Sequence, residues 1–362
     1  MRGQVTLRDI ALAAGVSRAT VSLVLRDSPL VHAETRARVE RELERQHYVY
    51  NRAAANLRTR TSSSVALVIN DLSNPFFAEF AAGVDEALGE AGYVTLLGST
   101  GESPERQQAV LASLMEHNPA GLILSPAENS DVLQLKQVLG RHRNILLFNR
   151  TLEGAEWDFL ALDNARGAWL ATTHLIGRGH RHITFFGGHA DSSSCRQRRE
   201  GYLCAMQGAG LQPVLIESVP TRQDAAARCS ALFDDVIEPP TAAVCYNDSV
   251  ALGLMPALAA LGIVPGRDFA VTGFDDIAEA ELATPSLTTV AVGPRERGRQ
   301  AARLVLERIA MQDTAPRHCT AIVELKVRQS SGPTHTKFHP RRRKLQSGAV
   351  PNKSSTPNLA KS

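Results

Sequence analysis

Short apolar segments recur along most of the chain, and their alternation with amphipathic stretches is the feature that most constrains the fold. A first series lies at residues 65–69, 94–97, 121–125 and 145–148, and a second at 159–162, 183–186, 242–245 and 270–272. Strands that alternate with helices form parallel sheets with right-handed crossovers. Two such series predict a two-lobed α/β core over residues 65–334. Its ligand cleft is expected at the carboxyl ends of the strands.

The length and the charge distribution place a second, smaller domain before this core. The chain has 362 residues, which is too many for one ordinary hydrophobic core. Residues 1–64 contain eleven Arg and six acidic residues, and residues 335–362 contain seven Lys or Arg and no acidic residue. Because the net charge of the whole chain is +3, residues 65–334 carry −9. An acidic core with a basic start suits a nucleic-acid contact, although solvated tails are also often basic.

The cysteines and the hydropathy pattern indicate a cytoplasmic protein. The five cysteines at 195, 204, 229, 245 and 319 contain no C-x-x-C pair, which predicts reduced thiols, mostly in the core. The first residues show no apolar stretch of a signal peptide, and no apolar run is long enough to span a membrane. We therefore expect no membrane association.

The first fifty residues predict a helix-turn-helix domain over 1–50. Thr6 stands three residues before Asp9 and is suited to cap a helix, and Ser17 can cap a second helix after the turn at Gly15. A third helix is predicted over 33–46, with Val39 closing a small core. In such motifs the second helix enters the major groove of DNA. From the pattern alone, a three-helix packing module without DNA function remains the alternative.

These residues resemble the start of lac-repressor family proteins closely. The matching motifs are Thr6-Leu7-Arg8-Asp9-Ile10-Ala11, Ala14-Gly15-Val16-Ser17 and Thr20-Val21-Ser22, with further matches at 35–36, 48, 51–52 and 54–57. The resemblance implies a sequence-specific transcription regulator, most simply a repressor, that binds pseudo-palindromic operator DNA as a homodimer. The spelling of residues 21–26 and 245–247 is loosely similar to maltose-regulon-like repressors.

The resemblance implies two sets of DNA-binding residues. The first lies on the helix-turn-helix, where Arg18 is suited to guanine edges and Ala19 and Leu23 to apolar contact with a thymine methyl. Many members have Arg at the position of Leu23, so their operator does not carry over. The other DNA contacts expected in this domain are Thr6, Ser17, Thr20, Ser22 and Arg26. The alternative for Arg26, expected at a phosphate, is a solvated surface residue.

The second set lies in a hinge and linker over residues 51–64. The resemblance implies that Asn51, Arg52, Ala54 and Leu57 belong to a short helix that forms on operator DNA, where Leu57 wedges into the minor groove. The alternative for Leu57 is a linker residue that packs on the core. Tyr50 departs from the Pro that most members have before the Asn, which makes the start of this hinge less rigid.

The resemblance continues through the core to about residue 333 and implies a type I periplasmic-binding-protein-like fold. Motifs that carry it include Asp71-Leu72-Ser73-Asn74-Pro75, Asn247-Asp248 and Gly273-Phe274-Asp275-Asp276. It implies a small effector, a sugar or sugar phosphate, in the cleft between the lobes. Its expected contacts are Phe76, Phe77, Arg150, Ser194, Arg198, Asn247 and Asp275. Aromatic rings suit the C–H face of a sugar, and a carboxylate, an amide and guanidinium groups suit its hydroxyls. Phe76 and Phe77 can also be plain core residues.

Other functional classes fit the sequence less well. No nucleophile elbow, Walker A loop or complete G-x-G-x-x-G is present, so we expect no catalytic residues and no cofactor. His180 and His182 suit structural roles better than a metal pair, and we expect no metal. A sugar-binding transport protein would share the core but needs a signal peptide. A sugar-active enzyme needs paired carboxylates in the cleft, and the neighbouring Asp275 and Asp276 are expected to point apart.

The last segment, residues 335–362, is predicted to be a basic disordered tail. It contains Arg341-Arg342-Arg343-Lys344 followed by a Ser-, Pro- and Asn-rich end, with too few apolar residues to fold. Since it has no leucine heptad, the dimer surface is expected on the core.

Overall fold

The computed structural model describes residues 5–25, 27–48, 62–189, 192–234, 238–311 and 314–334. The chain divides into two compact units, residues 1–64 and residues 65–362. Each unit is considered by itself.

The described residues of the first unit form three helices, α1 (Leu7–Ala13), α2 (Arg18–Leu25) and α3 (Ala33–Arg45). A capping box starts α1, in which the Asp9 amide donates to the Thr6 hydroxyl and the Thr6 amide donates to the Asp9 carboxylate at 2.9 Å. Gly15 turns the chain with a φ of +62°. The core of the unit is formed by Ile10, Ala11, Ala14, Val21, Val24 and Val39. The predicted helix-turn-helix and its third helix are thus confirmed, with α3 ending one residue earlier than expected.

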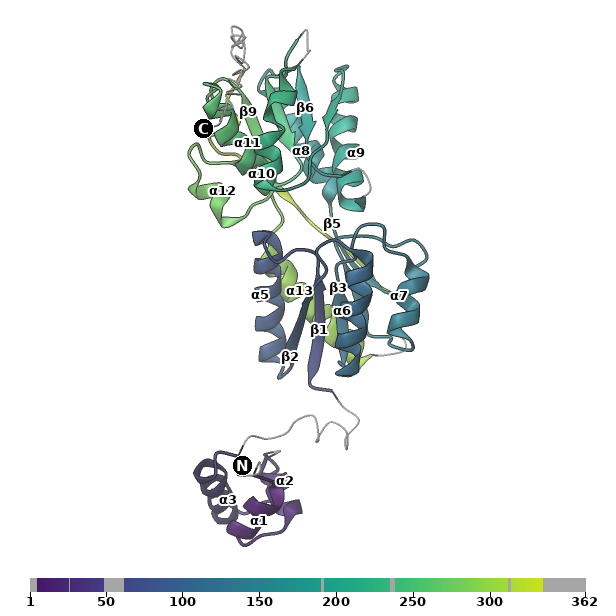
Figure 1. Ribbon diagram of the computed structural model, residues 1–362, viewed down its shortest axis with the longest axis vertical. Coiled ribbons are helices and arrows are strands. Elements are labelled where there is room, and N and C mark those ends of the chain that lie inside the picture. The colour runs from purple at the N-terminus through teal and green to yellow at the C-terminus, as the bar shows by residue number, and fades with distance from the viewer. Residues whose placement is uncertain are drawn as a thin grey trace, which may run out of the picture. The chain divides into compact units, whose positions relative to one another are not determined.

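The second unit contains two six-stranded sheets, each with helices of its own, and forms two lobes (Figure 1). The first lobe has the strand order β11-β5-β4-β3-β1-β2, all parallel in the pairs that the structure defines. Its strands are β1 (Ser64–Ile69), β2 (Val94–Ser99), β3 (Gly121–Leu124), β4 (Ile145–Phe148), β5 (Asp158–Leu162) and β11 (His318–Ala321). Its helices are α5 (Pro75–Glu90), α6 (Pro104–Glu116), α7 (Val132–Leu139) and α13 (Pro294–Ala310).

The second lobe repeats this arrangement with the order β12-β10-β9-β8-β6-β7, in which only the pairing of β10 with β12 is antiparallel among the described strands. Its strands are β6 (Ile183–Phe186), β7 (Val214–Ile216), β8 (Ala242–Cys245), β9 (Ala270–Asp275), β10 (Thr288–Ala291) and β12 (Glu324–Lys326). Its helices are α8 (Asn164–Gly177), α9 (Ser193–Gly208), α10 (Arg222–Ala227), a 3-10 turn (Cys229–Leu232), α11 (Asp248–Ala260) and α12 (Ala278–Leu282).

One predicted strand belongs to the other lobe. Residues 159–162 were expected to open the second series, but β5 pairs in parallel with β4 of the first sheet. The chain crosses to the second lobe only after Leu162, and it crosses again at 291–294 and 321–324. Apolar alternation cannot assign a strand to one of two similar sheets, because both demand the same buried pattern.

The inner strands of both sheets are largely covered on both faces, and close helix packing positions the cleft residues. All four residues of β3, β4, β6 and β8 are buried. On the second lobe, α9 packs directly on α8, since a Cβ at Gly201 would lie only 1.9 Å from the carbonyl oxygen of Ala165. This close approach fixes the first turn of α8 against the middle of α9.

Candidate DNA-binding surface and effector pocket

The first turn of α2 presents an exposed polar surface on the first unit. Ser17 caps this helix by accepting a hydrogen bond from the Thr20 amide at 3.1 Å. Ser17, Arg18 and Ala19 are all exposed, whereas Val21 and Val24 face the core. The first turn of α2 contains no acidic residue, so its free amides and Arg18 suit an anionic partner such as a phosphate backbone.

The remaining residues expected at DNA fall into two groups. Thr6 is exposed at the start of α1, and Thr20, Ser22 and Leu23 are half-buried along α2. Thr20 and Ser17 join their hydroxyls at 2.9 Å, which orders the start of the helix. Arg26, Asn51, Arg52, Ala54 and Leu57 lie outside the described residues, as does the tail over 335–362.

In the second unit, polar side chains gather where the strands of the first sheet end. Arg150 follows β4, Asn70 follows β1 and Ser125 follows β3, and all three are buried. Glu102, three residues after β2, accepts two hydrogen bonds from the Arg150 guanidinium at 2.6 and 2.8 Å. Burial acts to lower the pKa of Arg150, but the hydrogen bonds and charge of Glu102 outweigh it and raise that pKa. Arg150 therefore stays charged.

The two phenylalanines expected at the effector lie at the start of α5. Asn74 caps this helix through the Phe76 amide at 3.1 Å. Phe76 and Phe77 are both buried and meet edge to face at a ring distance of 5.0 Å, and Phe76 also stacks on Phe148 at 6.0 Å. The rings thus belong to a continuous aromatic cluster at the carboxyl end of the first sheet.

The second lobe contributes a network centred on Arg198, which projects from α9. Its Nε donates to the Asn164 side chain at 2.8 Å, and one terminal nitrogen donates to the carbonyl of Tyr246 at 2.7 Å. The other terminal nitrogen lies 3.5 Å from a carboxylate oxygen of Asp275. The guanidinium also lies 3.6 Å from the ring centroid of Phe274. Arg198 and Asp275 are thus brought together, as a ligand pocket requires.

Ser194 and Asn247 occupy different places in this lobe. Ser194 is buried and lies within 3.1 Å of the Tyr246 hydroxyl and 2.9 Å of the Ser192 hydroxyl. Asn247 is also buried, but its side-chain oxygen caps α11 by accepting from the Val250 amide at 2.9 Å. This capping bond occupies one acceptor site of the Asn247 side chain.

Two buried carboxyl groups give the second lobe an unusual charge state. Burial and then the charge of Asp275 raise the pKa of Asp248 well above its ordinary range, although Thr289 and the Ile277 amide donate hydrogen bonds to it. Burial raises the pKa of Asp275 to about 7, against the opposing charge of Arg198. Asp276 points elsewhere and pairs with Arg328 at 2.8 Å. A ligand that donates hydrogen bonds to the Asp275 carboxylate would therefore stabilise it.

The two lobes meet at these polar ends. The Asn164 amide, at the start of α8, lies 3.5 Å from the side-chain oxygen of Asn149, which follows β4 in the first lobe. The phenol of Tyr246 also acts on the pKa of Arg150 from the opposite lobe. The two walls therefore face each other across one site.

Sequence reasoning missed Glu102, Asn164 and Tyr246 as members of this site. Asn164 and Tyr246 each follow a strand within two residues, which is the position where ligand residues of parallel sheets stand. Glu102 lies in a turn with a φ of +63°, and no local pattern indicates its pairing with a residue 48 positions away. Val292 is buried at a crossing between the lobes.

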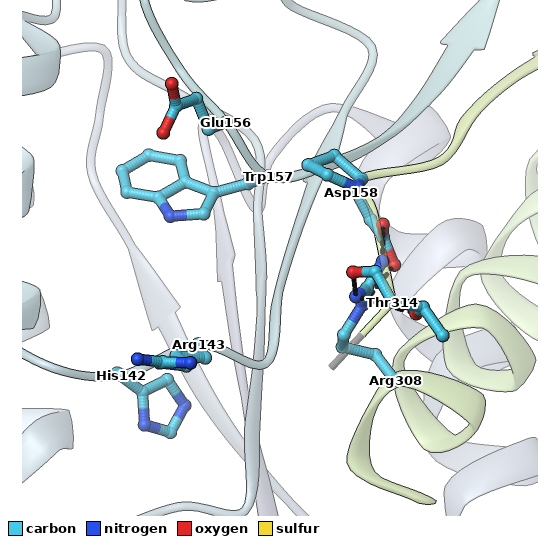
Figure 2. Close-up of a pocket in the computed structure, with 8 residues that line it drawn as sticks. His142, Arg143, Glu156, Trp157, Asp158, Arg308 and Thr314 are labelled. Atoms are coloured by element: carbon cyan, nitrogen blue, oxygen red, sulfur yellow. Dashed lines mark hydrogen bonds and ion pairs between the residues drawn. The ribbon is translucent and has the colours of Figure 1, made fainter. Parts of the chain in front are cut away.

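A separate pocket of about 390 Å³ lies at the opposite edge of the first sheet, near the beginnings of β4 and β5 (Figure 2). Trp157 and Glu156 lie above Arg143 and His142 on one side, and Asp158 lies with Arg308 and Thr314 on the other. Asp158 is buried and forms ion pairs with Arg308 and Arg317. Because its buried charges are already paired and it lies away from the strand carboxyl ends, this pocket is not the candidate effector site.

The histidine, cysteine and hydropathy patterns concern residues outside the candidate effector site. His180 is buried and bonded to Thr241 at 2.8 Å and to the Gly332 carbonyl at 3.0 Å, which confirms its structural role. All five cysteines are free thiols. Within the part of the chain that the structure describes, no group of three or more His, Cys, Asp or Glu residues is placed to hold a metal ion. Nor does any described helix have the length and apolar character needed to cross a membrane.

Comparison with known proteins matches both units. Residues 6–51 match the family of bacterial regulatory proteins, lacI family, and residues 172–331 match a periplasmic binding protein-like domain. The chain is 32% identical to the HTH-type transcriptional repressor PurR of Vibrio atlanticus (strain LGP32), over 85% of this chain and 93% of the relative. It is also 32% identical to the HTH-type transcriptional regulator GalR of Escherichia coli (strain K12), over 86% of this chain and 90% of the relative.

Solved structures with the same fold include two regulators with bound ligands. A lac repressor dimer bound to operator and the anti-inducer ONPF matches with a TM-score of 0.81 and 24% identity, over 91% of this chain and all of that chain. A complex of the transcriptional regulator CelR with cellobiose matches with a TM-score of 0.67 and 29% identity, over 90% of this chain and all of that chain.

Proposed function

This chain belongs to the lacI family of bacterial regulatory proteins and is a DNA-binding regulator of transcription, and from this premise we propose that a sugar bound between its two lobes controls its affinity for operator DNA. The observation that carries the proposal is the buried network that joins Arg198, Asp275 and Asn164 to Asn149 of the opposing lobe. Such a network is costly to bury unless it is satisfied, and it is suited to hydroxyl ligands.

We propose a sugar as the ligand because the site combines hydrogen-bonding side chains with aromatic rings. Hydrogen-bond donors and acceptors reach the site from two directions, and they belong to Arg150, Arg198 and the amides of Asn149 and Asn164. Asp275 adds a carboxylate that accepts hydrogen bonds from hydroxyls. The aromatic cluster of Phe76, Phe77 and Phe148 supplies an apolar floor. A cellobiose complex of a related regulator supports this ligand class.

The proposed DNA contacts are those of the helix-turn-helix and the hinge. Arg18 would select guanine edges in the major groove, while Ser17, Thr6 and the helix amides would hold phosphates. The protein acts in the cytoplasm as a homodimer, whose symmetry matches two operator half-sites. The related lac repressor bound to operator is also a dimer, which supports this assembly.

The test couples DNA binding to ligand binding in the same molecule. Selection of bound fragments from random DNA is expected to yield a pseudo-palindrome. A thermal-shift screen of sugars is expected to yield at least one stabilising ligand, because a ligand that binds the folded state raises its apparent stability. Recovery of no preferred DNA sequence would rule out the regulator role, whereas stabilisation by a purine and by no sugar would rule out only the effector class.

A further inference from the structure

The geometry of the ion pair between Glu102 and Arg150 indicates which charge an effector can carry into the site. Both oxygens of the Glu102 carboxylate accept from the two terminal nitrogens of Arg150, at 2.6 and 2.8 Å. This bidentate arrangement is the strongest form in which a carboxylate holds a guanidinium. The Arg150 side chain is 8% exposed and that of Glu102 is 36% exposed, so solvent reaches the pair mainly from the side of Glu102.

The surrounding residues fix Glu102 in this position. The Asn70 amide donates to Glu102 Oε2 at 3.2 Å, and the backbone amide of Glu128 donates to the same oxygen at 3.3 Å. Asn70 is itself held by the Pro126 carbonyl at 2.9 Å. Glu102 also has a φ of +63°, a conformation that a non-glycine residue adopts only where its surroundings hold it. The carboxylate is therefore built into the wall.

Arg150 faces more negative charge than Glu102 alone. Its guanidinium also donates to the Pro126 carbonyl at 3.1 Å and lies 3.9 Å from a carboxylate oxygen of Glu128. In the second lobe, Arg198 is engaged by Asn164, the Tyr246 carbonyl and Asp275. Both described arginines of the pocket thus lie beside carboxylates.

Resting on the proposed sugar-binding function, we propose that Glu102 is a specificity-determining residue that holds Arg150 and makes the pocket select uncharged sugars over sugar phosphates. A phosphate group carries about two negative charges, which would enter a buried site. There it would lie near Glu102 and Glu128, and neither the lost hydration nor the repulsion would be compensated. Neutral hydroxyls instead donate to the carboxylates and accept from the guanidinium edges without breaking the pair.

The first test uses inorganic phosphate as the probe, so that it does not depend on knowing the effector. The full-length protein is heated in phosphate and in chloride of equal ionic strength, and the shift in Tm is compared between variants. Glu102→Gln removes the charge that neutralises Arg150, and we expect phosphate to raise its Tm by about 2 °C or more beyond the shift of wild type. The double variant Glu102→Gln with Arg150→Met is expected to lose this gain.

Two further variants serve as matched controls. Glu105→Gln removes one negative charge three residues away, where the exposed carboxylate contacts Ser103 and not Arg150, and it is expected to behave as wild type. Glu102→Asp keeps the charge and is expected to keep phosphate out. If Glu102→Gln fails to fold, Glu102→Ala in the same assay takes its place.

The second test uses matched ligand pairs, glucose with glucose 6-phosphate and ribose with ribose 5-phosphate, in calorimetric titrations. Wild type is expected to bind no phosphorylated partner as tightly as its neutral sugar, and Glu102→Gln is expected to gain about tenfold or more for the phosphorylated partner. Stabilisation of wild type by phosphate that Arg150→Met abolishes would overturn the inference, as would a Glu102→Gln variant indifferent to phosphate. If no sugar binds wild type, the proposed effector class fails while the phosphate test still decides the role of Glu102.

Discussion

Arg18 is the residue that we propose links the first unit most directly to a DNA sequence. It is exposed on the first turn of α2, beside the Ser17 cap that orders that turn. A guanidinium at this place can donate two parallel hydrogen bonds to a guanine, so the strength of its contact depends on the DNA sequence. A contact with a phosphate group does not depend on the sequence in this way.

We predict that Arg18→Ala weakens binding to the native operator by about 1–3 kcal/mol and weakens binding to random DNA much less. Arg38→Ala removes the same charge from an exposed position on α3 and is the matched control. Fluorescence anisotropy on both DNAs at one salt concentration measures the difference. An equal loss on both DNAs would make Arg18 a phosphate contact only.

Asp275 makes the stability of the second unit depend on pH. Burial raises its pKa to about 7 in the folded protein, from an ordinary value of 3.8. Between these values the folded state holds a proton that the unfolded state has lost, so the contribution of Asp275 to stability falls as pH rises through this window. Above pH 7 the contribution is constant.

The free energy of unfolding of wild type relative to Asp275→Asn is therefore expected to fall from about pH 4 to about pH 7 and then to level off. Urea unfolding followed by the fluorescence of Trp157 and Trp169, the two tryptophans of the chain, measures it. A difference that does not change with pH would show that Asp275 is ionised throughout.

At the scale of elements, helices were easier to predict than the assignment of strands to sheets. The caps of α1 and α2 are local signals, because Thr6 and Ser17 act on amides three residues away. β5 was assigned to the wrong lobe, because the point at which the chain crosses between lobes is a long-range property. The pairing of Glu102 with Arg150 is long-range in the same sense, and the capping role of Asn247 became visible only with the start of α11.

The hinge over residues 51–57 is an element whose prediction depends on sequence alone, since it lies outside the described residues. We expect Ala54→Gly to weaken operator binding, because Gly costs a helix about 1 kcal/mol relative to Ala and a dimer contains two copies. Leu57→Ala is expected to weaken both binding and bending of operator DNA, because the minor-groove wedge is lost. Gel retardation with circularly permuted operator fragments measures both. Two variants that bind and bend DNA like wild type would contradict a hinge mechanism.

At the scale of the whole molecule, the sequence predicted the two units and the class of function better than the ligand. The helix-turn-helix signature is dense and local, and the alternating strands define a two-lobed core. The proposed effector contacts are side chains from distant segments, such as Glu102, Arg150, Arg198 and Asp275, whose joint charge no single motif contains. For this reason the proposed preference for sugars over sugar phosphates rests on the structure and not on a sequence motif.

The most direct test of a regulator controlled from its cleft is the operator affinity of wild type and Asp275→Ala, each with and without a sugar that stabilises wild type. We predict that the sugar changes the operator affinity of wild type by about 5- to 150-fold, the usual size of allosteric coupling. Asp275→Ala is predicted to bind operator as tightly as sugar-free wild type and to show no response. If the variant responds like wild type, or if a sugar binds wild type without changing its operator affinity, then the cleft does not control DNA binding in this protein.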